Sequence, residues 1–121
     1  MAHILVAEDE RAVREFVRRA LTHRGHEVTL AEDGLAALDV LGSNSFDLLL
    51  TDIVMPGLDG IALALKVSSL KPDMKILMMS GYAAERQRAH NLDALIHRVI
   101  AKPFTLREIC DAVDETLSAA S

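Results

Sequence analysis

The hydrophobic residues of this chain alternate between two kinds of spacing along its whole length. Short apolar runs are typical of strands, and the stretches between them have the three-to-four-residue spacing of amphipathic helices. The predicted strands are residues 4–7, 27–30, 46–51, 75–79 and 99–101. The first predicted helix begins after Glu10, the second covers residues 34–41, and the third begins after residues 59–60 and ends before Pro72. The fourth covers residues 84–91, and the fifth begins after Thr105.

The first and last predicted helices have clear apolar faces, and the fourth does not. Gly25 is placed to end the first helix, whose face is Val13, Phe16, Val17, Ala20 and Leu21. Thr105 and Glu108 have the spacing of a capping box at the start of the last helix. The face of that helix is Leu106, Ile109, Cys110, Val113 and Leu117. Residues 84–91 are mostly polar, so we expect this helix to pack weakly.

Strands that alternate with helices predict a parallel sheet with helices on both faces. Residues 27–30 alternate polar and apolar, as an edge strand does, whereas 46–51 are apolar almost throughout, as a central strand is. Right-handed crossovers leave few topologies for such a chain. We therefore predict an α/β fold, a flavodoxin-like (βα)5 doubly wound sandwich with a five-stranded parallel sheet in the order 2-1-3-4-5.

Four of the predicted strands deliver a chemical group where the strand ends. Glu8 and Asp9 follow the first strand, and Asp52 closes the third. Ser80 follows the fourth strand and Lys102 the fifth. Because ligands of open α/β sheets bind outside the carboxyl ends of the strands, we expect these side chains to meet at one site.

Three acids, a hydroxyl and an amine at one place suit a divalent cation and a phosphoryl group. Mg²⁺ prefers oxygen ligands, so Asp9 and Asp52 are expected to bind it directly, and Glu8 directly or through water. A backbone carbonyl just past Asp52 is a further candidate ligand. An aspartate can act as a nucleophile that forms an aspartyl phosphate, with Lys102 and Ser80 on the phosphoryl oxygens.

Composition narrows the class of protein. The 121 residues suit one compact domain over 1–121, and we expect no separate output domain. A formal net charge of −5 argues against a nucleic-acid-binding surface. The single Cys110 fits a reducing compartment and a buried place on a helix. No apolar stretch approaches the roughly 18 residues of a membrane span, and no leader is apparent, so we expect a cytoplasmic protein without membrane contact.

With these residues, the chain resembles the response-regulator receiver domains over essentially its whole length. The matching strings are Glu8-Asp9, Thr51-Asp52 with Met55-Pro56 and Asp59-Gly60, Ser80-Gly81, and Lys102-Pro103-Phe104. The resemblance implies that Asp52 accepts a phosphoryl group from a histidine kinase or a histidine phosphotransferase, and that the protein catalyses only its own phosphoryl transfer and dephosphorylation.

The resemblance also implies a role for each residue around Asp52. Ser80 is the switch hydroxyl that moves toward the phosphoryl group, Lys102 pairs with that group, and the Lys102-Pro103 peptide is cis. The implied Mg²⁺ ligands are Glu8, Asp9, Asp52 and the carbonyl of Val54.

The chain departs from the family pattern at two positions. Glu8 stands where Asp is commoner, which is expected to alter the metal geometry slightly. Val99 stands three residues before Lys102, where receivers usually carry Tyr or Phe, so the usual aromatic switch is missing. Tyr82 is a candidate replacement, and the alternative is that it is simply partly buried in a loop. We hypothesise that the weakly apolar helix at 84–91 and its flanking loops carry the output.

Within the family, three segments are similar to the CpdR-type single-domain regulators of alphaproteobacteria. They are residues 48–56, 80–84 and 99–104. That similarity implies a downstream protein partner of the AAA+ protease class, and a part in regulated proteolysis and the cell cycle, with phosphorylation turning the activity off. The sequence does not reveal the cognate kinase, the target or the active phosphorylation state. A weak homodimer is one option for the assembly.

Two other classes fit the fold less well. A Mg²⁺-dependent phosphohydrolase with an aspartyl-phosphate intermediate would need a second acid near the nucleophile, and Asp59 is the only nearby downstream acid. Such an enzyme would also need a cap over its substrate, and the chain has no insertion for one. A flavin-binding domain would need a phosphate-cradling loop after the first strand, where Glu8 and Asp9 would repel a phosphate.

Overall fold

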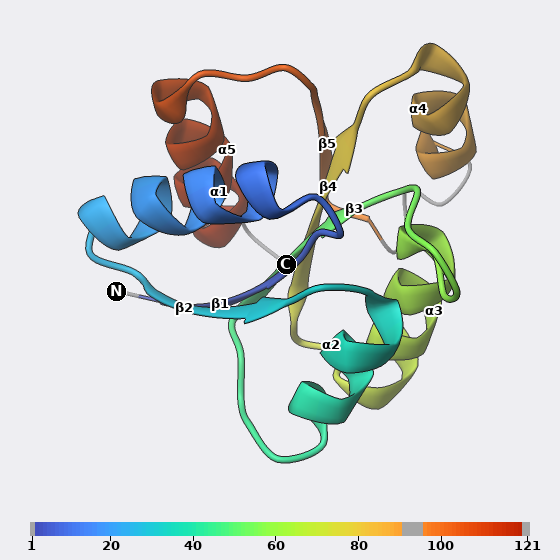
Figure 1. Cartoon of the computed structure of the whole chain (residues 1–121). Coiled ribbons are helices and arrows are strands. Elements are labelled where there is room, and N and C mark those ends of the chain that lie inside the picture. The colour runs from blue at the N-terminus through green and yellow to red at the C-terminus, as the bar shows by residue number, and fades with distance from the viewer. Residues whose placement is uncertain (1, 91–95, 120–121) are drawn as a thin grey trace.

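The structure is a computed structural model that describes residues 2–90 and 96–119. Five strands alternate with five helices within these residues (Figure 1). The strands are β1 His3–Ala7, β2 Glu27–Ala31, β3 Leu48–Asp52, β4 Lys75–Ser80 and β5 Arg98–Ala101. The helices are α1 Arg11–His23, α2 Gly34–Leu41, α3 Gly60–Leu70, α4 Ala83–His90 and α5 Leu106–Ser118.

All neighbouring strands pair in parallel, in the order β2-β1-β3-β4-β5. The predicted fold class is therefore confirmed, including the edge position of β2. The helices α1 and α5 cover one face of the sheet, and α2, α3 and α4 cover the other (Figure 1).

The central strands are buried on both faces, which explains their nearly continuous apolar sequence. Leu48 and Leu50 of β3 pack with α1 and α5, whereas Leu49, between them, packs with α2 and α3. Successive side chains of a strand point to opposite faces, so each central strand contributes to both halves of the core. The result is a sheet whose ends, and not its faces, are open to solvent.

The boundaries of the elements differ from the prediction in small ways. Phe46 lies just before β3, and its ring packs on that of His3 with centroids 4.3 Å apart. Leu106 is 44% exposed, so its predicted place on the buried face of α5 is wrong. It is the first residue of the helix, and Phe104 of the preceding loop packs on the core instead. Residue 91 of the predicted fourth helix lies outside the described residues.

Local chemistry sets the ends of two helices as expected. Gly25 follows the last turn of α1 with φ 92°, a conformation that favours glycine. The capping box of α5 is present, because the Thr105 hydroxyl accepts from the Glu108 N–H and the Glu108 carboxylate accepts from the Thr105 N–H. Among the described residues, none of the helices has the length and apolar character that a membrane crossing requires.

Candidate functional site

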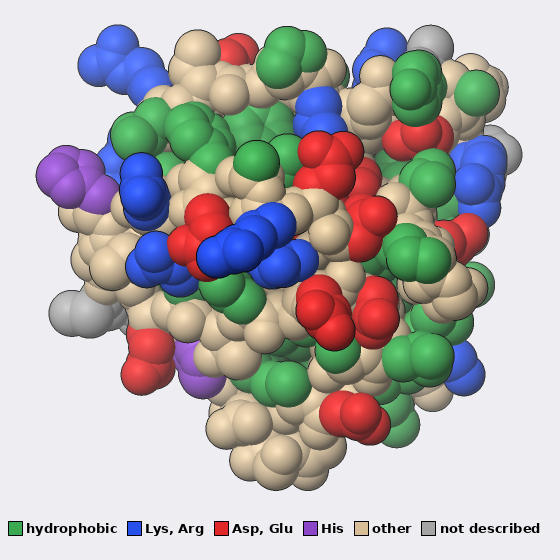
Figure 2. Space-filling model, viewed as in Figure 1, with side chains coloured by type: hydrophobic (Ala, Val, Ile, Leu, Met, Phe, Trp, Pro, Cys, Tyr) green, Lys and Arg blue, Asp and Glu red, His purple; other side chains and the backbone are tan. Residues whose placement is uncertain are grey.

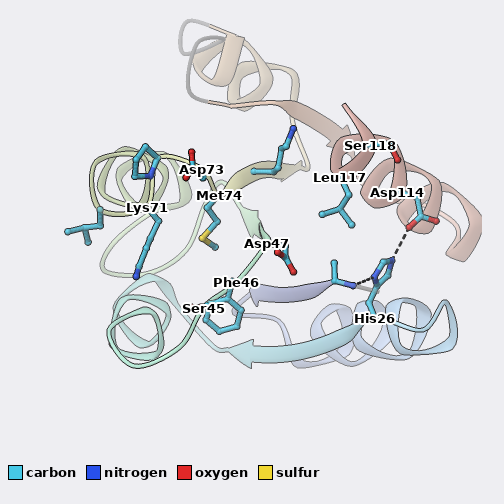
Figure 3. Close-up of a pocket in the computed structure, with 14 residues that line it drawn as sticks. His26, Ser45, Phe46, Asp47, Lys71, Asp73, Met74, Asp114, Leu117 and Ser118 are labelled. Carbon is cyan, nitrogen blue, oxygen red and sulfur yellow. Dashed lines mark hydrogen bonds and ion pairs between the residues drawn. The ribbon is translucent and has the colours of Figure 1, made fainter. Parts of the chain in front are cut away.

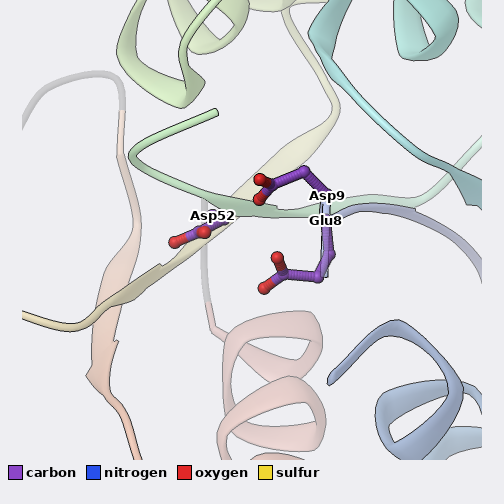
Figure 4. Close-up of side chains that lie close together, drawn as sticks. All are labelled: Glu8, Asp9 and Asp52. Atoms are coloured by element: carbon purple, nitrogen blue, oxygen red, sulfur yellow. The ribbon is translucent and has the colours of Figure 1, made fainter. Parts of the chain in front are cut away.

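The carboxyl ends of β1 and β3 bring three acids together. Glu8 and Asp9 follow β1, Asp52 ends β3, and the three side chains lie close together (Figure 4). One oxygen from each carboxylate lies within 4.8 Å of the other two. Hard oxygen donors at this spacing can hold a divalent cation, and a cation would relieve their mutual repulsion. The sequence prediction of one acidic site is therefore confirmed.

Asp52 is held rigidly at the end of β3. Its side chain is almost buried, and its Oδ1 accepts a hydrogen bond of 3.0 Å from the Ile53 N–H. The backbone of α3 lies directly against this turn, since a Cβ at Gly60 would stand 1.9 Å from the Asp52 carbonyl oxygen. The Gly60 N–H also donates to the Ile53 carbonyl at 2.8 Å. Only glycine fits at the first position of α3, and this fixes the backbone that carries the carboxylate.

Lys102, which follows β5, connects two of the three acids. Its Nζ lies 2.8 Å from Oε1 of Glu8 and 3.1 Å from Oδ2 of Asp52. The Lys102 N–H donates to the Ser80 carbonyl, and the Lys102-Pro103 peptide is cis, as expected. The backbone of Lys102 is thus tied to the end of β4, and its ammonium contacts the acidic site.

The electrostatics of the site are those of partly buried opposite charges. Burial raises the pKa of Glu8 and of Asp52 above their ordinary values, although Lys102 opposes the shift in both. Burial acts to lower the pKa of Lys102, but the hydrogen bond to Glu8 and the charge of Asp52 outweigh it, and the net shift is upward. One ammonium faces three carboxylates, so the site retains negative charge that favours a cation.

Ser80 is the last residue of β4. It follows Met79, the residue that pairs with Asp52 of β3. Its side chain is fully buried, and its hydroxyl donates to the Tyr82 carbonyl at 2.9 Å. The hydroxyl is thus near the acidic site in the fold and engaged by the loop that leads into α4.

A cavity of about 680 Å³ opens beside Asp9, Asp52 and Lys102. Val54, the predicted source of a carbonyl ligand, also lines this cavity. Tyr82 stands at its edge with 73% of its surface exposed, so the expectation of partial burial is wrong for this residue. In the space-filling view, acidic side chains gather where β1 and β3 end, beside a group of Lys and Arg side chains (Figure 2).

Sequence reasoning missed two residues of the site. Arg14 of α1 donates to the Glu8 carbonyl at 2.8 Å, and so supports the turn that presents the acids. Glu85 of α4 is buried and lines the cavity. Arg14 lies near the start of α1, only six residues after Glu8, and this closeness in the sequence could have indicated the contact. Glu85 gave none, because it stands among other charged residues of a helix without an apolar face.

A second cavity, of about 800 Å³, lies at the opposite end of the sheet (Figure 3). There the His26 ring lies between the Ala2 N–H and the Asp114 carboxylate, at 3.2 and 2.9 Å. None of the predicted site residues lines it. The chemistry predicted from the sequence is therefore gathered at one end of the molecule.

Comparisons with known proteins agree with this geometry. The model of the response regulator receiver domain matches residues 4–114. The chain is 39% identical over 120 residues to the response regulator receiver protein CpdR of Brucella abortus, which covers 99% of this chain and 100% of that protein. It is 41% identical over 106 residues to the response regulator MprA of Mycobacterium avium, which covers 88% of this chain but 46% of MprA.

Solved structures of response regulators have the same fold. The response regulator protein TrrA of Thermotoga maritima, in complex with Mg²⁺-BeF, superposes with a TM-score of 0.86 at 32% identity, covering 96% of this chain and 99% of TrrA. A CheY-like receiver domain protein of Methanospirillum hungatei superposes with a TM-score of 0.89 at 30% identity, covering 97% and 94% of the two chains.

Proposed function

The chain belongs to the response regulator receiver domain family of two-component systems, and we propose that it accepts a phosphoryl group on Asp52. One observation carries the proposal. The Asp52 carboxylate meets the Lys102 ammonium beside an open cavity, with the oxygens of Glu8 and Asp9 within 4.8 Å. A nucleophile close to both a cationic side chain and metal-binding oxygens is the arrangement that phosphoryl transfer needs.

The donor in this proposal is a phosphohistidine of a histidine kinase or a histidine phosphotransferase. An Asp52 oxygen attacks phosphorus and forms the O–P bond while the N–P bond breaks. The electron pair of that bond returns to the imidazole, which takes up a proton and leaves neutral. Lys102 neutralises part of the charge on the transferred group, and the Ser80 hydroxyl donates to it after leaving the Tyr82 carbonyl. The protein thus acts on its own aspartate and not on a released substrate.

The donor set fits Mg²⁺, which when bound supplies positive charge to the phosphoryl oxygens. Asp9 and Asp52 are the proposed direct ligands, with the Val54 carbonyl as a further one. Both oxygens of Glu8 already have partners, since Oε1 accepts from Lys102 and Oε2 accepts from the Glu10 N–H at 3.0 Å. We therefore assign Glu8 to the metal through water, and to the placement of Lys102.

The output in this proposal is a change of protein contacts in the cytoplasm. The similarity to CpdR over the whole of both chains supports a single-domain regulator that acts on an AAA+ protease and through it on regulated proteolysis and the cell cycle. Neither nucleic acid nor a membrane takes part in this proposal, and its assembly is at most a weak homodimer.

The structure gives no support to the phosphohydrolase alternative. Asp59 is the N-cap of α3, where its Oδ1 accepts from the Ala62 N–H and its Oδ2 accepts from Arg88. An acid with both oxygens engaged in this way is not available as a general acid or base beside Asp52.

A small-molecule phosphodonor in Mg²⁺ tests the proposal. Wild type should be labelled, whereas Asp52→Ala and wild type in EDTA should not. Asp39→Ala, an exposed aspartate of α2, is the matched control and should be labelled like wild type. Equal labelling of Asp52→Ala and wild type would refute the assignment.

A further inference from the structure

Glu85 is a buried acid in the wall of the cavity into which Asp52 opens. It lies in the first turn of α4, and its side chain is among the few buried polar ones, with 9% of its surface exposed. Its Oε1 accepts a hydrogen bond of 3.2 Å from the Gly81 N–H. Gly81 follows Ser80 directly and lines the same cavity. An acid in this position brings negative charge to a place that an anion is expected to enter.

Two donors at the wall of the cavity are already engaged. The Lys102 ammonium contacts Glu8 and Asp52, and the Gly81 N–H contacts Glu85. A phosphoryl group carries a charge of about −1.5 to −2 and three acceptor oxygens, so it needs donors and is repelled by a neighbouring carboxylate. A phosphoryl group on Asp52 and the carboxylate of Glu85 therefore compete for the same hydrogen-bond donors and positive charge.

We propose that Glu85 is an internal competitor of the phosphoryl group, which leaves Gly81 and the cavity when Asp52 is phosphorylated. This inference rests on the proposed function of Asp52. It makes Glu85 a positioning residue, because in the unphosphorylated state it holds the Gly81 N–H and the loop after β4 in place. It also sets the rate of phosphoryl transfer, because its charge opposes the incoming group.

The departure of Glu85 would reach α4 directly. The turn between β4 and α4 is held by two side-chain contacts, from the Ser80 hydroxyl to the Tyr82 carbonyl and from the Gly81 N–H to Glu85. The first turn of α4 therefore depends on an acid that phosphorylation repels. Such a device gives α4 a response to phosphorylation in a chain that carries Val99 in place of the usual aromatic residue.

Charge removal at Glu85 tests the competition. In Mg²⁺ with acetyl phosphate, Glu85→Gln should be phosphorylated on Asp52 about tenfold faster than wild type, the scale expected for a nearby charge at a site shielded from solvent. Glu32→Gln removes an exposed acid from the loop after β2, at the same end of the sheet, and should match wild type. Equal rates for Glu85→Gln and wild type would overturn the inference while leaving the proposed function intact. An unlabelled wild type would instead overturn the proposed function.

Amide exchange gives a second, independent test, and its decisive measurement is made on the wild-type chain. Addition of Mg²⁺ and beryllofluoride, a phosphoryl analogue, should speed exchange in residues 84–90 at least severalfold and leave α5 unchanged. The variant Glu85→Ala should show the faster exchange without the analogue. Unchanged exchange in residues 84–90 of the wild type would contradict the proposed release of α4.

Discussion

Helices α1 and α5 cover one face of the sheet, and α4 lies on the other face. Different kinds of contact hold these two regions in place. The pair buries Val17, Ala20 and Leu21 of α1 against a continuous row of α5 side chains. Among residues 84–90, α4 buries only Glu85 and Ala89. Its remaining ties to the body include the Arg88–Asp59 ion pair at 3.1 Å.

This difference separates an anchored region from an exchangeable one. Apolar packing cannot be undone without leaving a cavity, so α1 and α5 have one favourable position. Polar contacts such as those of α4 can be replaced by others of similar energy, because a donor that loses one acceptor can take another or meet water. Segments that respond to ligands come from the less stable part of a fold. This difference supports α4 as the place of the response that we propose.

The largest expected effect is a loss of packing under α5. Ile109→Ala removes a fully buried side chain and should lower the free energy of unfolding by about 2–5 kcal/mol. Leu106→Ala, on the same helix but 44% exposed, should cost no more than about 0.5 kcal/mol. Urea denaturation of both variants measures the contrast. Similar losses would show that α5 is not anchored by its buried face.

Loss of the α5 cap should have a smaller effect. Thr105→Ala removes the hydroxyl that accepts from the Glu108 N–H, and about 1 kcal/mol of stability should be lost. Thr105→Ser retains a hydroxyl and should stay close to wild type in the same denaturation experiment. If the Ala and Ser variants were equally stable, the cap would contribute nothing to the anchoring of α5.

Loss of the ion pair of α4 should hardly change global stability. The Arg88 and Asp59 side chains are 52% and 34% exposed, and such pairs contribute about 0–1 kcal/mol. Arg88→Ala should nevertheless speed amide exchange in α4 relative to Gln87→Ala, an exposed change on the same helix. A loss of global stability as large as that of Ile109→Ala would contradict the division between anchored and exchangeable regions.

The smallest effect concerns the ion pairs beside the anchored helices. Burial acts to raise the pKa of Asp114, but His26 and Arg24 outweigh it and the net shift is downward. Asp114 therefore contributes stability that is present above the ordinary aspartate range and is lost as pH falls through its lowered pKa. Because its side chain is 40% exposed, the contribution is screened by solvent and should be below about 1 kcal/mol.

The variant Asp114→Asn measures that contribution. It should be slightly less stable than wild type at pH 7, and the difference should shrink toward pH 2. Asp39→Asn, on the exposed side of α2, is the control and should show no such convergence. A difference that grows as the pH falls would have the wrong sign for a lowered pKa.

The sequence was sufficient to predict the fold because its signals are local. The two spacings of apolar residues gave all five strands and helices, and parallel strands alone imply that Glu8, Asp52 and Lys102 meet at one end. Burial was less predictable. Leu106 fits the period of α5 but is exposed, because the loop residue Phe104 packs on the core in its stead.

Individual contacts within the site were beyond sequence reasoning. The bond from Lys102 to Glu8 joins residues 94 positions apart, and it depends on where two loops end in space. The buried carboxylate of Glu85 accepts a hydrogen bond from the Gly81 backbone N–H. The spacing of hydrophobic residues carries no information about such a contact. The proposed replacement of the missing aromatic switch by Tyr82 stays a prediction, since exposure alone does not test it.

The close approach at Gly60 determines which half of the cavity is free to rearrange. With no room for even a methyl group between α3 and the Asp52 carbonyl, β3 and this helix are packed as one block at Asp52. Any displacement caused by a new group on Asp52 has to be absorbed across the cavity, in the segment from Ser80 to Glu85. A substitution at position 60 should thus displace the Asp52 carboxylate itself, whereas changes across the cavity should alter only the response that we propose for α4.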